Sequence, residues 1–242
     1  MGNRFLQRSY QKEEMDDFDS RGEIISKTLG ELDFINHWLG GYAVTRGGFN
    51  KLIDGTQPGE LTIADIGCGG GDTLIRIKKW ADHRGIRVKL IGIDANANII
   101  TEAAGHMKDI ENKELIHGNI FNTDLSGQKI DIVNCTLLVH HFTDDELVKF
   151  FRIMAGIARL GIIINDLHRH WLAYHSIRIL TRLFSGSSMV IHDAPLSVLR
   201  AFKRKELEAI LNSAGLNNYQ LRWKWAFRWQ VVIKTSNNEH TP

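Results

Sequence analysis

Short apolar runs alternate with amphipathic stretches along the chain from residue 60 onward. The apolar runs predict five strands, at residues 61–67, 88–94, 114–119, 131–138 and 161–166. Their near-continuous apolarity is typical of parallel strands that are buried on both faces. The amphipathic stretches between them predict helices near residues 72–83, 96–107 and 144–157. This regular order of strand, helix and strand predicts a doubly wound α/β sheet.

The segment 201–235 returns to the same pattern after a long interruption. It predicts a helix near 203–213, followed by two strands near 219–224 and 228–234. Two strands so close together in sequence pair antiparallel. We therefore expect a seven-stranded, mostly parallel sheet whose last strand is antiparallel.

The rest of the chain predicts helical cover around this sheet. Apolar residues recur at helical spacing within the first 55 residues, for example at Ile25, Leu29 and Leu32. A long insertion with helical lid character follows the fifth strand. We divide the chain into an N-terminal helical cover, a core, a lid insertion, the C-terminal part of the core and a mobile tail, at residues 1–55, 56–166, 167–200, 201–235 and 236–242.

Composition narrows the class of protein. Hydrophobic residues make up 43% of the 242 residues and charged residues 24%, which is ordinary for a globular protein. The net charge is only +2 without a long like-charged block, so we expect no nucleic-acid partner. No apolar run approaches the ~20 residues of a membrane span. Cys68 and Cys135 form neither a disulfide framework nor a zinc spacing, which is typical of a cytoplasmic protein.

A glycine-rich turn follows the first predicted strand and opens the first predicted helix. The stretch is DIGCGGGD, residues 65–72. Its glycines allow a tight turn and let a ligand approach the main chain closely. Asp94 stands at the end of the second strand, about 20 residues beyond Gly71, where a carboxylate suits two ribose hydroxyls. The turn lacks the Gly-Lys-Ser/Thr sequence of a P-loop, which excludes that motif.

The glycine spacing resembles a known motif. Gly67, Gly69 and Gly71, with an acid two residues ahead of Gly67, resemble the first motif of class I S-adenosylmethionine (SAM) dependent methyltransferases. Asp94 is similar to the ribose-binding acid of that family, and HGNIFN to the segment after its third strand. The stretch DIVNCTLLVHHF resembles the fourth-strand motif of the subgroup that includes ubiquinone-type and other small-molecule methyltransferases. The resemblance covers residues 60–166 well and the last helix and strand pair more loosely.

This resemblance implies a Rossmann-like methyltransferase fold with SAM as cofactor, and it implies a role for individual positions. Asp65 would orient the methionine amino group, and Asp94 would take the ribose hydroxyls. The other implied cofactor contacts are Gly67, Cys68, Gly69 and Gly71 at the methionine, Ala95, Asn96, Asn119 and Ile120 at the adenine, and Thr136 and Leu137 near the sulfonium. The family more often has Asp at the position of Asn119, whose amide oxygen can still accept from an amino group.

Histidines concentrate in the second half of the chain. Because the carboxyl ends of neighbouring parallel strands share one crevice, His140, His141 and His168 can converge beside the methyl donor. A hydroxyl or phenol acceptor must lose a proton, and histidine is suited to accept it near neutral pH. We therefore predict a histidine general base among these three, with Asp166 as its partner. Histidine pairs completed by Asp166 or Asp193 could bind zinc, but no spacing is diagnostic, and we expect no metal.

The insertion and the N-terminal helices carry apolar and aromatic residues that suit a hydrophobic acceptor. A helix from residue 168 would place one stripe of side chains together: His168, Trp171, His175, Arg178 and Arg182. A strand that continued through residue 170 would instead place His168 and His170 on one face. The candidate acceptor contacts are Trp38, Trp171, His175 and Arg178. The stretch WKWAFRW near the end predicts a strand pair with core-facing aromatics rather than a ligand site.

Together these features predict a SAM-dependent methyltransferase of natural-product type. We expect a small, hydrophobic, aromatic or polyketide- or quinone-type acceptor and O-methylation with a histidine base. C-methylation of a phenolic ring needs the same proton removal and is the alternative. A SAM-binding partner protein without catalysis stays open, whereas the motif spacing disfavours a nucleotide-cofactor oxidoreductase. We expect a monomer or a homodimer.

Overall fold

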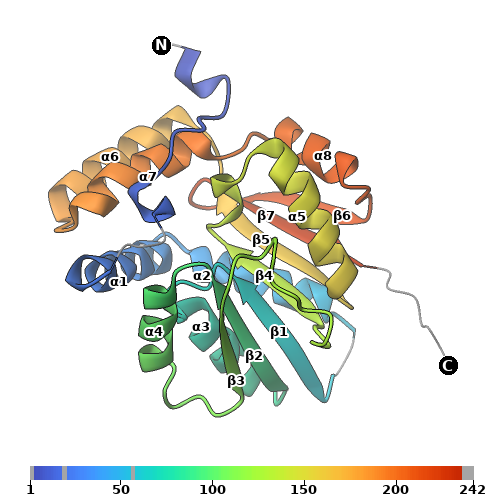
Figure 1. The fold of residues 1–242 in the computed structure, drawn as a ribbon. Helices are drawn as coiled ribbons and strands as arrows, with labels where there is room; N and C mark the ends of the chain where they lie inside the picture. The colour runs from blue at the N-terminus through green and yellow to red at the C-terminus, as the bar shows by residue number, and fades with distance from the viewer. Residues whose placement is uncertain (1–2, 18–20, 56–57, 236–242) are drawn as a thin grey trace.

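The chain forms one seven-stranded sheet in the computed structural model, which describes residues 3–17, 21–55 and 58–235 (Figure 1). The strand order is β3-β2-β1-β4-β5-β7-β6. The strands are β1 (Glu60–Ile66), β2 (Arg87–Asp94), β3 (Lys113–His117), β4 (Ile132–Thr136), β5 (Gly161–Leu167), β6 (Tyr219–Lys224) and β7 (Arg228–Lys234). β1 to β5 pair in parallel, whereas β7 is antiparallel to both β5 and β6. The predicted doubly wound sheet with an antiparallel last strand is confirmed.

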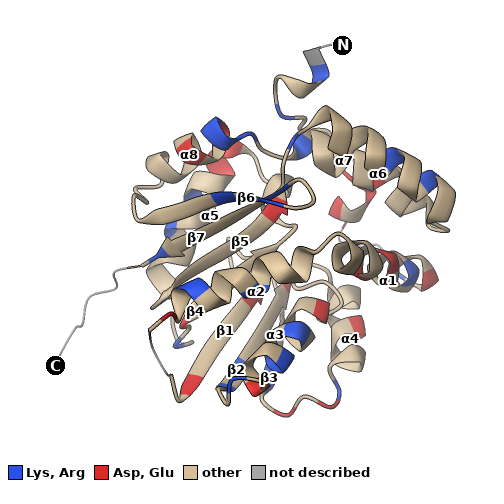
Figure 2. Ribbon diagram, turned by 180° about the vertical axis from the view of Figure 1, so that it is seen from behind, with Lys and Arg blue, Asp and Glu red and all other residues tan. Residues whose placement is uncertain are grey.

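Helices cover both faces of the sheet, which explains why its strands are apolar almost throughout. One face carries α2 (Gly41–Leu52), α3 (Asp72–Asp82) and α4 (Ala97–His106), and the other carries α5 (Asp144–Ile157) and α8 (Arg204–Ser213). Figure 2 shows that the charged residues of the sheet gather towards the strand ends. α2 belongs to the predicted N-terminal cover, but it packs on the sheet itself, against β5 and β7.

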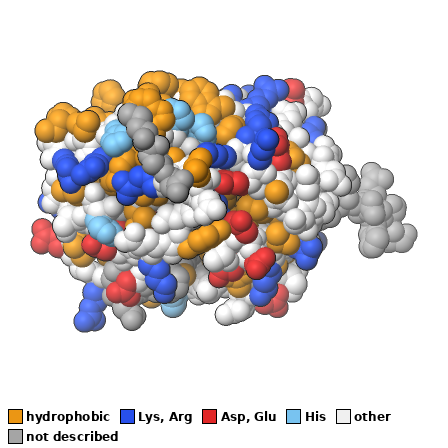
Figure 3. All heavy atoms as spheres, turned by 90° about the horizontal axis from the view of Figure 1, so that it is seen from above, with side chains coloured by type: hydrophobic (Ala, Val, Ile, Leu, Met, Phe, Trp, Pro, Cys, Tyr) orange, Lys and Arg blue, Asp and Glu red, His pale blue; other side chains and the backbone are white. Residues whose placement is uncertain are grey.

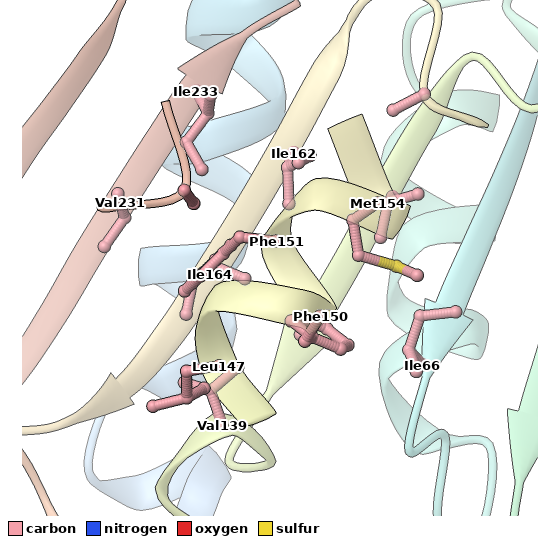
Figure 4. Packing of buried hydrophobic residues seen from close by; sticks show 14 of the residues in the cluster. Ile66, Val139, Leu147, Phe150, Phe151, Met154, Ile162, Ile164, Val231 and Ile233 are labelled. Atoms are coloured by element: carbon pink, nitrogen blue, oxygen red, sulfur yellow. The ribbon is translucent and has the colours of Figure 1, made fainter. Parts of the chain in front are cut away.

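α5 illustrates how the sequence builds the core (Figure 4). The helix buries one apolar stripe: Leu147, Phe150, Phe151 and Met154. These side chains pack against residues of β1, β5 and β7, and full burial of one such side chain is worth ~1.5–3 kcal/mol. The helix begins with a capping box, in which Thr143 Oγ1 accepts from Glu146 N–H at 3.4 Å and Glu146 Oε2 accepts from Thr143 N–H at 2.8 Å. The capping box and the buried apolar side chains thus both stabilise α5.

A second layer of helices lies together at one end of the sheet, at the upper left of Figure 1. It contains α1 (Glu23–Trp38), α6 (Trp171–Phe184) and α7 (Ser188–Arg200), with the short 3-10 helices η1 (Asn3–Phe5), η2 (Glu14–Asp16) and η3 (Val139–His141) nearby. No helix in the described part of the chain is long and apolar enough to cross a membrane. The tail predicted at 236–242 lies outside the described residues.

The chain stays extended for three residues between β5 and α6. His168 N–H donates to Phe227 O at 2.8 Å, and Arg169 N–H donates to Phe202 O at 3.0 Å. His170 then caps the helix, because its Nδ1 accepts from Leu172 N–H at 3.2 Å. α6 therefore begins at Trp171, and a helix from residue 168 is wrong.

Candidate active site

A cavity of about 850 Å³ lies at the carboxyl edge of the parallel strands. The glycine loop after β1 and the ends of β2 and β4 line one part of it. Residues of the N-terminal segment, η3, α1, α6, α7 and the β6–β7 hairpin line much of the rest. A doubly wound sheet binds its ligands in this crevice, and the volume is in the upper part of the ~300–1,000 Å³ range of small-molecule sites.

The glycine loop presents main chain to the cavity in a conformation that favours glycine. Gly67 and Gly69 have φ angles of +68° and +54°. A Cβ on Gly67 would also lie 2.7 Å from Leu138 Cδ1, which is too close for a real contact. The N–H groups of Gly67 and Cys68 donate to Ile93 O at 2.8 and 3.1 Å and tie the loop to β2. A ligand at this loop meets backbone rather than side chains.

Asp94 lies at the end of β2 beside this loop. Its two carboxylate oxygens accept from Gly69 N–H at 3.1 Å and from Asn96 N–H at 3.0 Å. Burial raises the pKa of Asp94, although these backbone bonds act in the opposite direction. Each oxygen keeps a lone pair for a ligand hydroxyl. Asn119 lines the same cavity, and its Oδ1 accepts from Phe121 N–H at 3.0 Å, so its side chain also shapes the turn after β3.

A buried histidine–aspartate pair stands where β4 and β5 end side by side. His140 Nδ1 lies 2.7 Å from Asp166 Oδ1, and the His140 backbone N–H donates to Asp166 Oδ2 at 3.2 Å. Burial alone would raise the pKa of Asp166, but the His140 imidazole and these hydrogen bonds outweigh it and hold that pKa below its usual range. A charged carboxylate at Nδ1 leaves His140 Nε2 as the nitrogen that can accept a proton. His140 itself lines the cavity.

A second histidine–aspartate pair lies next to the first. His141 Nδ1 lies 2.5 Å from Asp16 Oδ1, and Arg200 Nη1 donates to Asp16 Oδ2 at 2.6 Å. Burial opposes ionisation of Asp16, but these two hydrogen bonds prevail and lower its pKa below the usual range. The rings of His140 and His141 lie 4.3 Å apart, centroid to centroid. Two oriented imidazoles therefore share one wall of the cavity.

Glu13, from the N-terminal segment, lies between these two imidazoles. Its Oε1 is 3.7 Å from His140 Nε2, and its Oε2 is 3.8 Å from His141 Nε2. Burial raises the pKa of Glu13 to about 7, against the lowering effect of His141 and Arg200. Glu13 Oε1 has no hydrogen-bond partner within the described residues. We call Glu13, His140 and His141 the polar cluster.

The polar cluster could also hold a cation, because each of its residues offers one ligand atom and these atoms all lie within 4.8 Å of one another. Arg200 Nε, however, already brings a positive charge to 3.5 Å from Glu13 Oε1. Asp193 is occupied as well, since its oxygens accept from Glu14 N–H and Met15 N–H at 2.9 and 3.0 Å. That the site works without a metal stays a prediction, for which a test is given below.

Residues 63–161 match the family described as Methyltransferase domain. This stretch is less than half of the chain. The fold of the chain is that of the class I SAM-dependent methyltransferases. The structure is similar to human N-acetylserotonin methyltransferase in complex with SAM, with a TM-score of 0.61 and 17% identity, over 89% of this chain and 56% of that one. It is also similar to the plantazolicin methyltransferase BpumL in complex with SAH, with a TM-score of 0.61 and 16% identity, over 91% and 88% of the two chains.

Among curated proteins, the chain is 35% identical over 95 residues to ribosomal RNA small subunit methyltransferase H from Clostridium botulinum. This match covers 37% of the chain and 30% of the relative, so the chain spans less than a third of the relative's length. At the low identities of the structural matches, the likeness shows the fold alone. What the cavity binds must therefore be inferred from its own residues.

Most of the implied cofactor residues line the cavity: Gly67, Cys68, Gly69, Asp94, Ala95, Asn96, Asn119, Ile120, Thr136 and Leu137. The glycine loop leaves space that a Cβ would fill, and the carboxylate of Asp94 beside it can still accept hydrogen bonds. These two features fit the methionine and the nucleoside of SAM. Asp65 and Gly71 are not among the lining residues. The carboxylate of Asp65 is buried, where Asp65 Oδ1 accepts from Asn134 Nδ2 at 2.7 Å.

The predicted acceptor contacts do not line the cavity. Trp38, Trp171, His175 and Arg178 are not among the lining residues. α6 instead lines the cavity with Ala173, Ser176, Ile177 and Leu180. The stripe of aromatic and basic residues expected on α6 therefore exists, but it lies on another face of the helix.

His168 lines the cavity, but its surroundings disfavour a role as base. Burial, together with the positive charge of neighbouring His170 and Arg169, lowers the pKa of His168 to about 4. Trp223 Nε1, which can only donate, lies 3.3 Å from His168 Nδ1. This bond fixes the remaining proton of the neutral ring on Nε2. His168 therefore has no nitrogen left to accept a proton from the cavity, whereas His140 has one.

Several lining residues gave no recognisable signal in the sequence. Glu13, Asp16 and Arg200 come from segments far from the glycine loop. The hairpin also contributes: Trp225, Phe227 and Arg228 line the cavity, although the stretch WKWAFRW was interpreted as core. The buried Arg228 donates through Nη1 to Asn165 Oδ1 at 3.2 Å, and its Nε has no partner within the described residues. Burial lowers the pKa of Arg228 to about 10, so the group stays charged at neutral pH.

Proposed function

We propose that the protein transfers a methyl group from SAM to an oxygen of a small, largely apolar molecule. The observation that carries this proposal is one cavity that joins the glycine loop and Asp94 to the polar cluster. Its volume of about 850 Å³ leaves room for a second small molecule beside the cofactor. When bound, SAM supplies an electrophilic methyl group on a sulfonium.

Each side of the cavity has a task in this proposal. The glycine loop and Asp94 hold and orient the donor, which positions the methyl group for in-line attack. His140 Nε2 accepts the proton of the acceptor hydroxyl, while Asp166 keeps Nδ1 protonated and stabilises the imidazolium that forms. Arg228 brings a fixed positive charge to the same cavity and favours the anionic oxygen.

The acceptor class follows from the lining. Leu32, Leu39, Ile177, Val198 and Phe227 give the acceptor side a mainly apolar surface. It suits an aromatic, polyketide- or quinone-type molecule with an ionisable hydroxyl, as in natural-product biosynthesis. C-methylation of a phenolic ring would use the same proton removal and is the second candidate. Two buried free cysteines support a cytoplasmic location.

Cofactor binding is tested by calorimetry with SAM and with NADPH. We expect SAM to bind and Asp94→Asn to weaken it by about tenfold or more, because the amide loses one of the acceptor oxygens. Asp109→Asn, at an exposed carboxylate outside the cavity, is the matched control. Binding of NADPH without SAM would overturn the proposal.

Transfer is tested with methyl-labelled SAM, a cell extract of small molecules and, separately, total RNA. We expect label in small molecules as methyl ethers. Label on ring carbon would select C-methylation, label on RNA would contradict the acceptor class, and SAM binding without any transfer would favour a non-catalytic partner.

A further inference from the structure

The lid helix α6 exposes apolar side chains on the side that faces away from the molecule. Its buried face consists of Ala173, Tyr174, Ile177 and Thr181. The opposite face carries Leu172, Ile179 and Leu183, which are 42%, 58% and 69% exposed. Their spacing of seven and four residues places them on one side of the helix. A surface helix normally turns polar residues outward. The outward face of α6 thus lacks the composition of a surface that remains in water.

The apolar surface continues from α6 onto its neighbours. We define the apolar rim as Leu180, Leu183 and Phe184 of α6, Phe34 and Trp38 of α1, and Trp225 of the β6–β7 hairpin, which are between 42% and 78% exposed. Gly186 N–H donates to Glu31 Oε1 at 2.9 Å, which joins the end of α6 to α1. Ala226 N–H donates to Leu39 O at 3.4 Å, which joins the hairpin to the end of α1. The three elements are therefore neighbours.

This rim adjoins the mouth of the cavity. Leu180 and Trp225 are both exposed and among the residues that line the cavity, so they mark where it opens. Figure 3 shows hydrophobic side chains gathered along one edge of the upper face, with basic and histidine side chains beside them. An exposed apolar patch at the opening of a binding site indicates a surface that contacts a membrane or another protein.

The charged residues of α6 are all basic. Residues 167–192 contain no Asp or Glu, and Figure 2 shows basic residues and no acidic ones on α6. Arg178 and Arg182 lie one turn apart on this helix. The nearest acids of α1 are engaged within the protein, since Glu31 binds Ser185 and Asp33 binds Tyr42. An isologous contact with a second copy would bring these arginines towards each other, whereas an anionic lipid surface complements them.

We propose that the apolar rim docks on an anionic membrane surface. Phe184, Leu183 and the rim tryptophans enter the interface between headgroups and acyl chains, and Arg178 and Arg182 meet lipid phosphates, as in interfacial amphipathic helices. The cavity then opens towards the bilayer, so that a lipid-soluble acceptor enters without crossing water. This route for the acceptor rests on the proposed function, but the docking itself does not.

The full-length protein is sedimented with vesicles of phosphatidylcholine alone and of phosphatidylcholine with about one third phosphatidylglycerol. We expect binding to the anionic vesicles, less binding to the neutral ones, and a decrease at ~0.5 M salt because the charges are then screened. Leu183→Asp and Phe184→Asp should each lower the bound-to-free ratio by about tenfold. Ile24→Asp is the matched control, because Ile24 is an exposed apolar residue at the far end of α1 from Trp38.

SAM binding is measured on every variant and should be unchanged, which shows that each one is folded. Loss of vesicle binding in Leu183→Asp and Phe184→Asp but not in Ile24→Asp supports the proposal. No binding by a wild-type protein that binds SAM overturns the docking and leaves the proposed function intact. A dimer that Leu183→Asp converts to monomers, without vesicle binding, also overturns it and identifies the rim as a subunit interface.

Discussion

Asp65→Asn tests whether a buried carboxylate near the carboxyl end of β1 destabilises the native state. Asp65 is buried in β1 and accepts one hydrogen bond from Asn134 Nδ2, at 2.7 Å. Burial, aided by the nearby charge of Asp94, raises the pKa of Asp65 from 3.8 to about 7. At ~1.36 kcal/mol per pKa unit, ionisation of Asp65 costs the native state about 4 kcal/mol above pH 7. Asparagine keeps the shape and the acceptor oxygen for Asn134 but removes the charge.

The pH dependence has a defined sign. Between pH 3.8 and about 7 the native state holds a proton that the unfolded chain has lost, so the wild-type protein loses stability as pH rises through this window. Urea unfolding should therefore find Asp65→Asn more stable than wild type by about 4 kcal/mol at pH 8, but by only about 2 kcal/mol at pH 5. A variant that is no more stable at pH 8, or a difference independent of pH, would refute the reasoning. A loss of SAM affinity beyond about tenfold would instead assign Asp65 the direct contact that the motif implies.

Three further predictions concern the site. His140→Ala should lower turnover by about 10²–10⁴-fold and His168→Ala by less than tenfold, in the label-transfer assay; the reverse order would make His168 the base. Gly67→Ala should weaken SAM binding by at least about tenfold in calorimetry, since its Cβ would lie 2.7 Å from Leu138 Cδ1. Gly85→Ala is the control, because Gly85 has the same φ of +68° and a Cβ there would meet no atom within 4 Å. It should leave SAM binding unchanged and lower the free energy of unfolding by only the ~1–2 kcal/mol cost of the left-handed backbone. Treatment with a chelator should leave turnover unchanged; loss of turnover that zinc restores would make the polar cluster a metal site.

The cofactor side of the site could be predicted from the sequence because its geometry is local. Gly67 and Gly69 directly follow β1, Asp94 ends β2 and Thr136 ends β4. In parallel strands these ends meet at one edge, so knowledge of the strands places the residues. The hydrophobic pattern was strong for these strands because both faces of the sheet are covered.

Apart from the histidine–aspartate candidates, the acceptor side could not be predicted, because distant contacts decide it. Glu13 reaches the polar cluster from a segment without hydrophobic periodicity. The start of α6 depends on the backbone bonds of His168 and Arg169 to Phe227 and Phe202, which no local pattern reveals. The periodicity of α6 groups side chains into stripes, but only tertiary packing selects the stripe that faces the cavity.

The position of β7 between β5 and β6 has a consequence for the newly made chain. The strand ends that carry Gly67, Asp94 and Thr136 are all synthesised before β5 and β7. Arg200 and Arg228, by contrast, leave the ribosome after these strand ends, and β7 must then pair with β5 across a large separation in sequence. Contacts of this kind form slowly, because a long loop has to close before they are made. The acceptor side is therefore assembled after the cofactor side, once β7 has been synthesised.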